Sequence, residues 1–126
     1  MERAFRDSPA FTPRRRANYI YSLGLVAMAR KDPGAALDRF RECLERTAAL
    51  DAKSNLRVLA LSGSARAELA LGRPSDAESH ARQAVEIAES IFPKGTPSYL
   101  IAESRARLGE AQLARGDRAS ARRTLS

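Results

Sequence analysis

Two glutamates in the C-terminal third are the residues whose type and spacing come closest to catalytic chemistry. Glu103 and Glu110 are seven positions apart, so on a helix they would lie on roughly the same face, about 10 Å apart along its axis. A pair of carboxylates acts as general acid and base only where a pocket separates their pKa values. The alanines and arginines around them do not predict such a pocket, and no nucleophile motif or glycine-rich phosphate loop occurs. We therefore expect no catalytic residue and a protein that is not an enzyme.

The single cysteine and the single histidine could supply nucleophilic or metal-binding chemistry. One cysteine cannot form an internal disulfide, and Cys43 lies on the apolar face of a predicted helix, so we interpret it as a buried structural thiol. His80 lies among Glu78, Ser79 and Arg82 and is interpreted as a surface residue. Because no second histidine or cysteine accompanies it, a zinc site is not predicted. We expect neither a metal nor a cofactor.

The chain is strongly basic, with 22 lysines and arginines against 15 acidic residues and a net charge of +7. This charge favours an acidic partner, because arginine pairs with carboxylates and phosphates. The best candidate for a basic patch is the run Arg14, Arg15 and Arg16. The opposing interpretation is a solvated helix face. Single-stranded nucleic acid usually requires aromatic residues among the charges, and with only 6% aromatic residues nucleic acid is not the expected partner.

Short helices must position these residues. An apolar stripe at helical spacing is formed by Ile20, Leu23, Ala27 and Met28. The stripe stops at residues 31–34, where Asp32 can cap a following helix and Pro33 fits its first turn. The next apolar face is formed by Ala36, Phe40 and Cys43. This pattern predicts two antiparallel helices joined by a tight turn.

The hairpin pattern occurs three times. The alanine that follows the turn recurs after 41 and then 44 residues, as Ala36, Ala77 and Ala121. Twelve positions before each alanine stands a small residue that would allow close approach of the two helices: Gly24, Ala65 and Gly109. In the third copy we expect Thr96 to cap the first helix and Pro97 to open it.

The first hairpin resembles the tetratricopeptide repeat in its residue types and spacing, at Ile20, Leu23, Gly24, Ala27, Ala36, Phe40 and Cys43. The long spacing is similar to that of kinesin light chains and of repeat arrays in bacterial signalling proteins. The resemblance implies an all-α fold, a right-handed superhelical solenoid of about three antiparallel helix-turn-helix repeats with six helices. The repeats are predicted at residues 14–50, 54–91 and 97–126, the last truncated. Residues 1–13 are interpreted as an inter-repeat-like leader, partly disordered or left from a preceding repeat.

The resemblance also implies a function, a non-enzymatic scaffold that binds a protein or peptide. We expect it to be the sensory or scaffolding segment of a larger bacterial regulatory or signalling protein. No secretory signal and no apolar run of about 20 residues occurs, so we expect a cytoplasmic protein that does not cross a membrane. Two alternatives stay open. The basic surface could bind nucleic acid or another polyanion, or the apolar end near Ala121 and Leu125 could stack on a second copy.

In such solenoids the first helices of successive hairpins line a concave binding groove. We expect twelve residues to face it: Asn18, Tyr21, Leu25, Met28, Leu59, Ser62, Arg66, Leu69, Glu103, Ala106, Glu110 and Leu113. Three of them could instead pack between neighbouring helices, namely Met28, Leu69 and Leu113. The strongest candidates are Tyr21, Arg66 and Glu110, because an aromatic ring and two charges can read a peptide. The clamp with which chaperone-tail binders of this family hold a terminal carboxylate is matched only at Arg107, so that ligand is not predicted.

Overall fold

The computed structural model describes residues 12–50 and 53–126. Apart from Thr12 and Pro13, the predicted leader lies outside the described residues. The described part consists of six helices and contains no strand: α2 (Pro13–Ala29), α3 (Pro33–Leu50), α4 (Asn55–Ala70), α5 (Pro74–Ile91), α6 (Tyr99–Ala114) and α7 (Arg118–Leu125). None of these helices has the length and apolar character needed to cross a bilayer.

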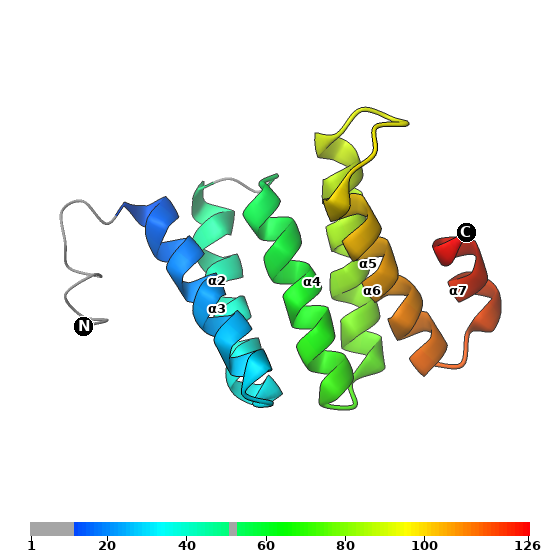
Figure 1. Cartoon of the computed structure of the whole chain (residues 1–126), viewed down its shortest axis with the longest axis horizontal. Helices are drawn as coiled ribbons and strands as arrows, with labels where there is room; N and C mark the ends of the chain where they lie inside the picture. The colour runs from blue at the N-terminus through cyan, green and yellow to red at the C-terminus, as the bar shows by residue number, and fades with distance from the viewer. Residues whose placement is uncertain (1–11, 51–52) are drawn as a thin grey trace.

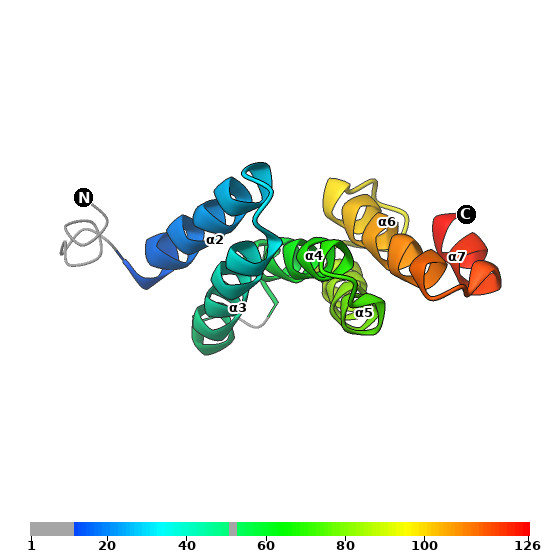
Figure 2. The same cartoon turned by 90° about the horizontal axis from the view of Figure 1, so that it is seen from below.

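The helices form three antiparallel pairs arranged in a row, α2 with α3, α4 with α5, and α6 with α7 (Figure 1). Seen along the helices, α2, α4 and α6 form the inner layer of an arc, and α3 and α5 lie outside it (Figure 2). The concave face of the arc is therefore built by the first helix of each pair. The predicted all-α solenoid of three hairpins is confirmed, while its right-handed superhelical twist and its repeat boundaries stay predictions.

The three hairpin turns share one backbone arrangement. In each, a backbone N–H donates to the carbonyl oxygen five residues earlier, over 2.8–2.9 Å: Asp32 to Ala27, Arg73 to Glu68, and Asp117 to Gln112. This bond closes a Schellman motif, in which the residue before the donor takes a left-handed conformation. That residue is Lys31 (φ 61°), Gly72 (φ 75°) or Gly116 (φ 83°). Two of the turns thus have the glycine that the conformation favours, and the first has a lysine.

Two predictions about helix starts have different outcomes. The cap of α3 is confirmed, because Asp32 Oδ1 accepts a 3.1 Å hydrogen bond from the backbone N–H of Ala35. The predicted start of α6 is wrong by two residues. The cap is Ser98, whose hydroxyl accepts a bond from the N–H of Ile101, and not Thr96.

The physical reason is a turn ahead of α6. The N–H of Thr96 donates to the carbonyl of Pro93 over 3.0 Å, around Gly95 at φ 86°. The chain is therefore still turning at Thr96, and Pro97 precedes the helix instead of opening it. α6 begins at Tyr99.

Two glycines pack closely against the ring of Phe40 where the first two hairpins meet. A Cβ added at Gly24 would lie 2.5 Å from the ring of Phe40, and one added at Gly63 would lie 2.8 Å from it. Phe40 is fully buried, and the ring of Tyr21 packs against it with the centroids 5.7 Å apart. One aromatic ring of α3 thus fixes how closely both α2 and α4 approach.

The other hairpins keep the same pairing of sizes. Gly109 faces Leu125, whose side chain would lie 2.6 Å from an added Cβ. The second hairpin has alanine at both corresponding positions, Ala65 and Ala81, and both are fully buried in one apolar cluster. The small residues predicted to allow close helix contact therefore do so in all three hairpins.

Candidate functional site

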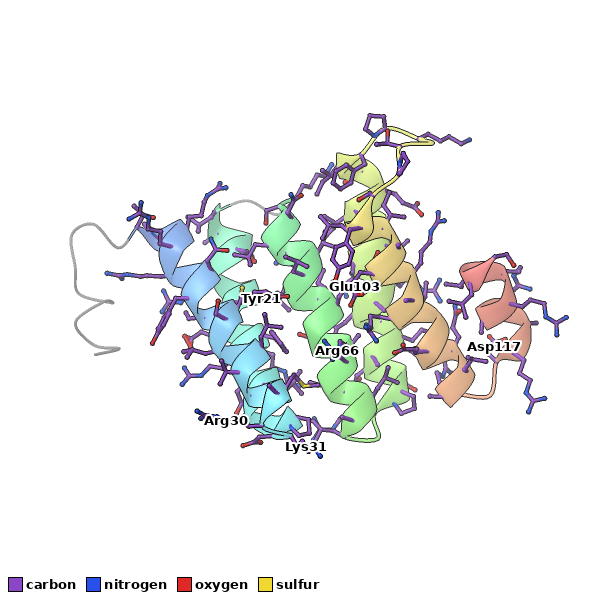
Figure 3. The ribbon with its side chains drawn as sticks, in the orientation of Figure 1. Tyr21, Arg30, Lys31, Arg66, Glu103 and Asp117 are labelled. Atoms are coloured by element: carbon purple, nitrogen blue, oxygen red, sulfur yellow. The ribbon has the colours of Figure 1, made fainter. Side chains whose placement is uncertain are left out.

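Side chains from three helices that are not consecutive in the chain lie together on the concave face. Tyr21 of α2, Arg66 of α4 and Glu103 of α6 lie on the three helices that build it, with Arg66 nearer to the hairpin turns than the other two (Figure 3). Burial raises the pKa of Tyr21 above its ordinary value, Tyr99 and Glu103 raise it further, and Arg66 opposes them. Groups on α4 and α6 therefore act electrostatically on the hydroxyl of one tyrosine on α2.

Arg66 and Arg107 differ in what they bind. The side chain of Arg66 is exposed and forms no hydrogen bond or ion pair with any residue in the described part of the chain. The Arg107 guanidinium binds Glu103 through Nε and Glu110 through Nη1, each at 2.9 Å. Burial acts to lower the pKa of Arg107, but the two carboxylates outweigh it and the pKa is raised. The two carboxylates considered for acid–base chemistry are thus joined by one cation, and Glu110 is not the free charge that we expected.

Sequence reasoning did not place Arg107 in this network, although the spacing contained the signal. Arg107 follows Glu103 by four residues and precedes Glu110 by three, the separations at which side chains on a helix meet.

The other residues predicted for the groove fall into three classes of exposure. Asn18, Leu25 and Leu113 are exposed, Leu113 at 50%. Four are half-buried, and of these Met28, Leu59 and Leu69 pack against the apolar clusters, while the fourth is Ala106.

Ser62 is the exception, because it is buried with only 3% of its surface exposed. A buried serine cannot contact a ligand, so this residue does not belong to the groove. α4 lies deepest in the arc, with α2 and α6 on either side of it (Figure 2). Neighbouring helices therefore cover the middle of α4.

Sequence analysis named Arg14 only as part of a basic run and did not name Asn55 or Tyr99, although the three form one row of exposed residues in the repeat register. Arg14, Asn55 and Tyr99 stand in the first turns of α2, α4 and α6 and are separated by 41 and 44 residues, the spacing of the repeat. All three are exposed, Tyr99 at 74%. Extending the offset by one helical turn towards the N-terminal ends would have found them.

The three consecutive arginines of α2 do not share one surface. Arg14 and Arg15 are exposed, whereas Arg16 is half-buried, and its Nε is buried with no partner among the described residues. Successive side chains on an α-helix point about 100° apart, so a run of three cannot face one way. Arg16 does not contribute to an exposed basic patch.

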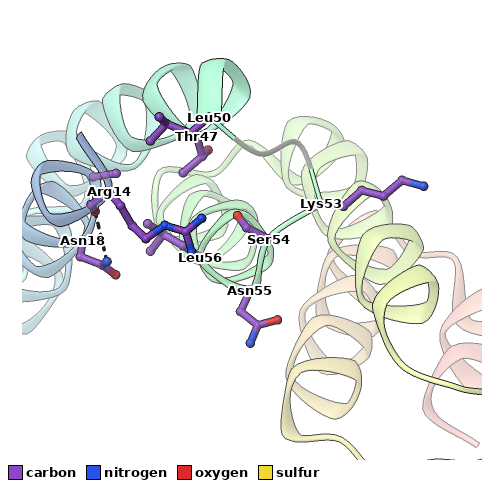
Figure 4. A pocket seen from close by; sticks show the side chains of 9 residues that line it. Arg14, Asn18, Thr47, Leu50, Lys53, Ser54, Asn55 and Leu56 are labelled. Carbon is purple, nitrogen blue, oxygen red and sulfur yellow. Dashed lines mark hydrogen bonds between the residues drawn. The ribbon is translucent and has the colours of Figure 1, made fainter. Parts of the chain in front are cut away.

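A pocket of about 380 Å³ lies between the N-terminal ends of α2 and α4, beside the end of α3. Its apolar lining includes Ala17, Leu50 and Leu56, and its polar lining includes Arg14 and Asn18. Arg14 extends its guanidinium from α2 towards Leu56 of α4 (Figure 4). The Arg14 side chain forms no hydrogen bond or ion pair within residues 12–50 and 53–126. The pocket therefore combines apolar and polar side chains with a cation that has no counter-ion among the described residues.

Cys43 and His80 both contact other residues inside the fold. Cys43 is fully buried, as predicted, and burial raises the pKa of its thiol to about 11. His80 is half-buried, contrary to the expectation of a surface residue, and its Nδ1 shares a 2.6 Å hydrogen bond with Glu68 Oε1, which is 1% exposed. The third hairpin makes the same cross-helix contact, from the Thr124 hydroxyl to Gln112 Oε1 over 2.7 Å. In the described part of the chain, no three metal-binding side chains are grouped.

A family model described as tetratricopeptide repeat matches residues 15–90, from the first turn of α2 to the last turn of α5. A comparison with curated proteins found no significant match. The matched residues contain the first two hairpins. The third hairpin repeats their turn, and its contact between Gly109 and Leu125 corresponds to that between Gly24 and Phe40 in the first.

Proposed function

Because the chain belongs to the tetratricopeptide repeat family, we propose that it is a non-enzymatic scaffold that binds a segment of another protein on the concave face of α2, α4 and α6. Proteins of this family generally mediate protein–protein interactions. The convergence of Tyr21, Arg66 and Glu103 from three helices carries the proposal. An aromatic ring and charges of both signs can hold a peptide by packing and by directed hydrogen bonds.

The state of the polar groups supports binding over catalysis. Glu103 and Glu110 are both held by Arg107, so neither is free to carry a proton to a substrate. Cys43 is buried and its thiol pKa is raised, which disfavours the reactive thiolate.

The distribution of arginines supports a protein partner over a polyanion. Several of the arginines that make the chain basic are paired with carboxylates: Arg82 and Arg115 with Glu78, and Arg105 with Glu89. Arginines that are already paired are less available to bind phosphates.

We place the module in a larger cytoplasmic protein of bacterial regulation or signalling, as its sensory or scaffolding segment. The repeat spacings of 41 and 44 residues support this context, because they are similar to those of repeat arrays in such proteins.

The test begins with a phage-displayed library of random peptides, selected on the immobilised protein. The selected peptide is then titrated against the wild type, Arg66→Ala and, as a control, Arg41→Ala on the exposed side of α3. We expect Arg66→Ala to weaken binding by about 1 to 3 kcal/mol, because charge-assisted bonds are lost, while the melting curve stays unchanged.

Two results would contradict the proposal. If the selected peptide binds Arg66→Ala as tightly as the wild type and is lost on changing Arg39 and Arg46 of α3, the convex face carries the function. If Arg66→Ala unfolds the protein, the arginine is part of the fold and not of the binding face.

A further inference from the structure

We propose that the partner segment is acidic and carries two anchors, a carboxylate next to an apolar side chain at the pocket of Arg14 and a second carboxylate at Arg66. This inference rests on the proposed function and names the chemistry of the partner. The two anchors lie on α2 and α4, so the partner runs obliquely across the concave face.

The first line of support is the charge of α2 and α4. α2 contains no acidic residue, and the only one in α4, Glu68, is buried and bound to His80. Both helices nevertheless present an exposed guanidinium to the concave face without a counter-ion among the described residues, Arg14 and Arg66. Such a surface is complementary to carboxylates and repels basic segments.

The second line of support is the pocket beside Arg14. Its lining is mixed, with apolar surface from Ala17, Leu50 and Leu56, and its volume of about 380 Å³ exceeds that of one large aliphatic side chain. Arg14 reaches over it from α2 (Figure 4). A leucine or similar residue can pack against Ala17 and Leu56 while an adjacent carboxylate pairs with the Arg14 guanidinium. Either contact alone would leave part of the pocket empty.

The third line of support is the state of the carboxylates on α6. Glu103 and Glu110 already share Arg107, which offsets one of their two negative charges and gives each carboxylate a partner. Of these charged side chains, those without a partner in the described part of the chain are therefore Arg14 of α2 and Arg66 of α4.

The repeat geometry gives the distance between the two anchors. Arg66 stands in the register of Leu25, 41 residues earlier, and Leu25 is eleven residues after Arg14. Eleven residues of helix rise about 16 Å and packed helices lie about 10 Å apart, so the anchors are about 20 Å apart, or about six residues of extended peptide.

The test uses fluorescein-labelled peptides of about twelve residues in fluorescence anisotropy. The acidic probe carries an Asp-Leu pair and a second aspartate six positions away in an otherwise Gly/Ser sequence. The neutral probe has asparagine at both aspartates, and the short probe places the aspartates three positions apart. We expect the acidic probe to bind at least about tenfold more tightly than either of the others, because each loses a charge-assisted contact.

Variants separate specific pairing from net charge. Arg14→Glu and Arg66→Glu should each abolish binding of the acidic probe, and each should restore binding to a probe with lysine at the matching position. Arg41→Glu changes the net charge equally on the outer helix and should stay within about twofold of the wild type. Thermal melts of the three variants establish that they are folded, and Arg14→Gln replaces Arg14→Glu if the latter is not.

Each of the following results would overturn the inference. The first is equal binding of the acidic and neutral probes, and the second is an equal loss in Arg41→Glu and Arg14→Glu. The third is a thymidine oligonucleotide that binds more tightly than the acidic probe and depends on the same two arginines. A peptide selected by phage display that needs Arg66 but carries no acidic residue would also refute the inference, yet it would leave the scaffold function intact.

Discussion

Phe40 is the residue on which the packing of the first two hairpins depends, because Gly24 and Gly63 contact its ring from opposite helices. Neither contact has spare volume, since the ring is fully buried. Gly109 has a similar contact, but with Leu125, a half-exposed side chain near the end of the short helix α7. The same glycine-to-alanine change therefore has different consequences at these positions.

We expect Gly63→Ala to destabilise the protein by about 1 to 3 kcal/mol, since the added methyl group overpacks the contact with Phe40. Gly109→Ala should be neutral or slightly stabilising, because Leu125 can move and alanine is favoured over glycine in a helix by about 1 kcal/mol. Urea unfolding of both variants measures the difference. Equal losses would contradict the size pairing described for the hairpins.

Cys43 should be unreactive in the folded protein. Burial raises its thiol pKa to about 11, so the thiolate, which is the reactive form, is scarce at pH 8. We expect a thiol reagent such as DTNB to modify Cys43 at pH 8 only slowly, and rapidly once urea unfolds the chain. Immediate stoichiometric modification of the native protein would show that the thiol is accessible.

At the scale of the helices, the turn between α2 and α3 carries a local strain that the other two turns lack. Lys31 has φ 61°, where the corresponding residues are Gly72 and Gly116. A left-handed conformation costs an L-residue about 1 to 2 kcal/mol, and glycine adopts it readily. Figure 3 shows that Lys31 lies at the tip of the hairpin, next to Arg30.

We expect Lys31→Gly to stabilise the protein by about 0.5 to 1 kcal/mol, after the greater flexibility of glycine in the unfolded chain is subtracted. The matched control is Arg30→Gly, one residue earlier, where φ is −85°. That change should destabilise the protein, because no strain is relieved. Thermal melts of the two variants should therefore shift in opposite directions, and a common shift would be against the assignment of strain to Lys31.

At the scale of the whole molecule, Glu78 joins the second and third hairpins. Its carboxylate binds Arg115 at the end of α6 and Arg82 on its own helix, the latter at 2.7 Å. The hydrogen bond from Arg115 is the largest influence and lowers the pKa of Glu78 below its ordinary value of 4.5, against the opposing effect of burial.

A carboxyl group with a lowered pKa in the folded state stabilises the protein above the unfolded pKa, and this contribution disappears as the pH falls through the folded pKa. We therefore expect the wild type to lose stability below about pH 4.5. Glu78→Gln should be less stable than the wild type at pH 7, by no more than about 1 kcal/mol because the partners of Glu78 are largely exposed. The variant should also lose less stability than the wild type as the pH falls. Urea midpoints measured from pH 3 to 7 test this expectation. If the midpoints of the two proteins changed in parallel with pH, Glu78 would not contribute to the loss of stability in acid.

The sequence predicted most of the fold because the hairpins are specified by local spacing. Gly72 and Gly116 indicated the turns in which they lie, and the spacing of Ala36, Ala77 and Ala121 indicated the length of the repeat. The local pattern could not show that Ser62 is covered, since its burial depends on helices from different hairpins.

The binding face was predicted less completely for a similar reason. Arg107 and Tyr99 follow from helical spacing and from the repeat offset, so both could have been found in the sequence. The pairing of His80 with Glu68 could not, because the partner lies across the hairpin.

The exposed row of Arg14, Asn55 and Tyr99 has a consequence for how such a protein changes over evolutionary time. One repeat position carries a cation, an amide and an aromatic side chain, while most core positions of the same helices are small or apolar. Exposed substitutions outside special contacts usually change stability by no more than about 0.5 kcal/mol. Substitutions in this row can therefore change which ligand is bound without changes in the core residues that stabilise the fold.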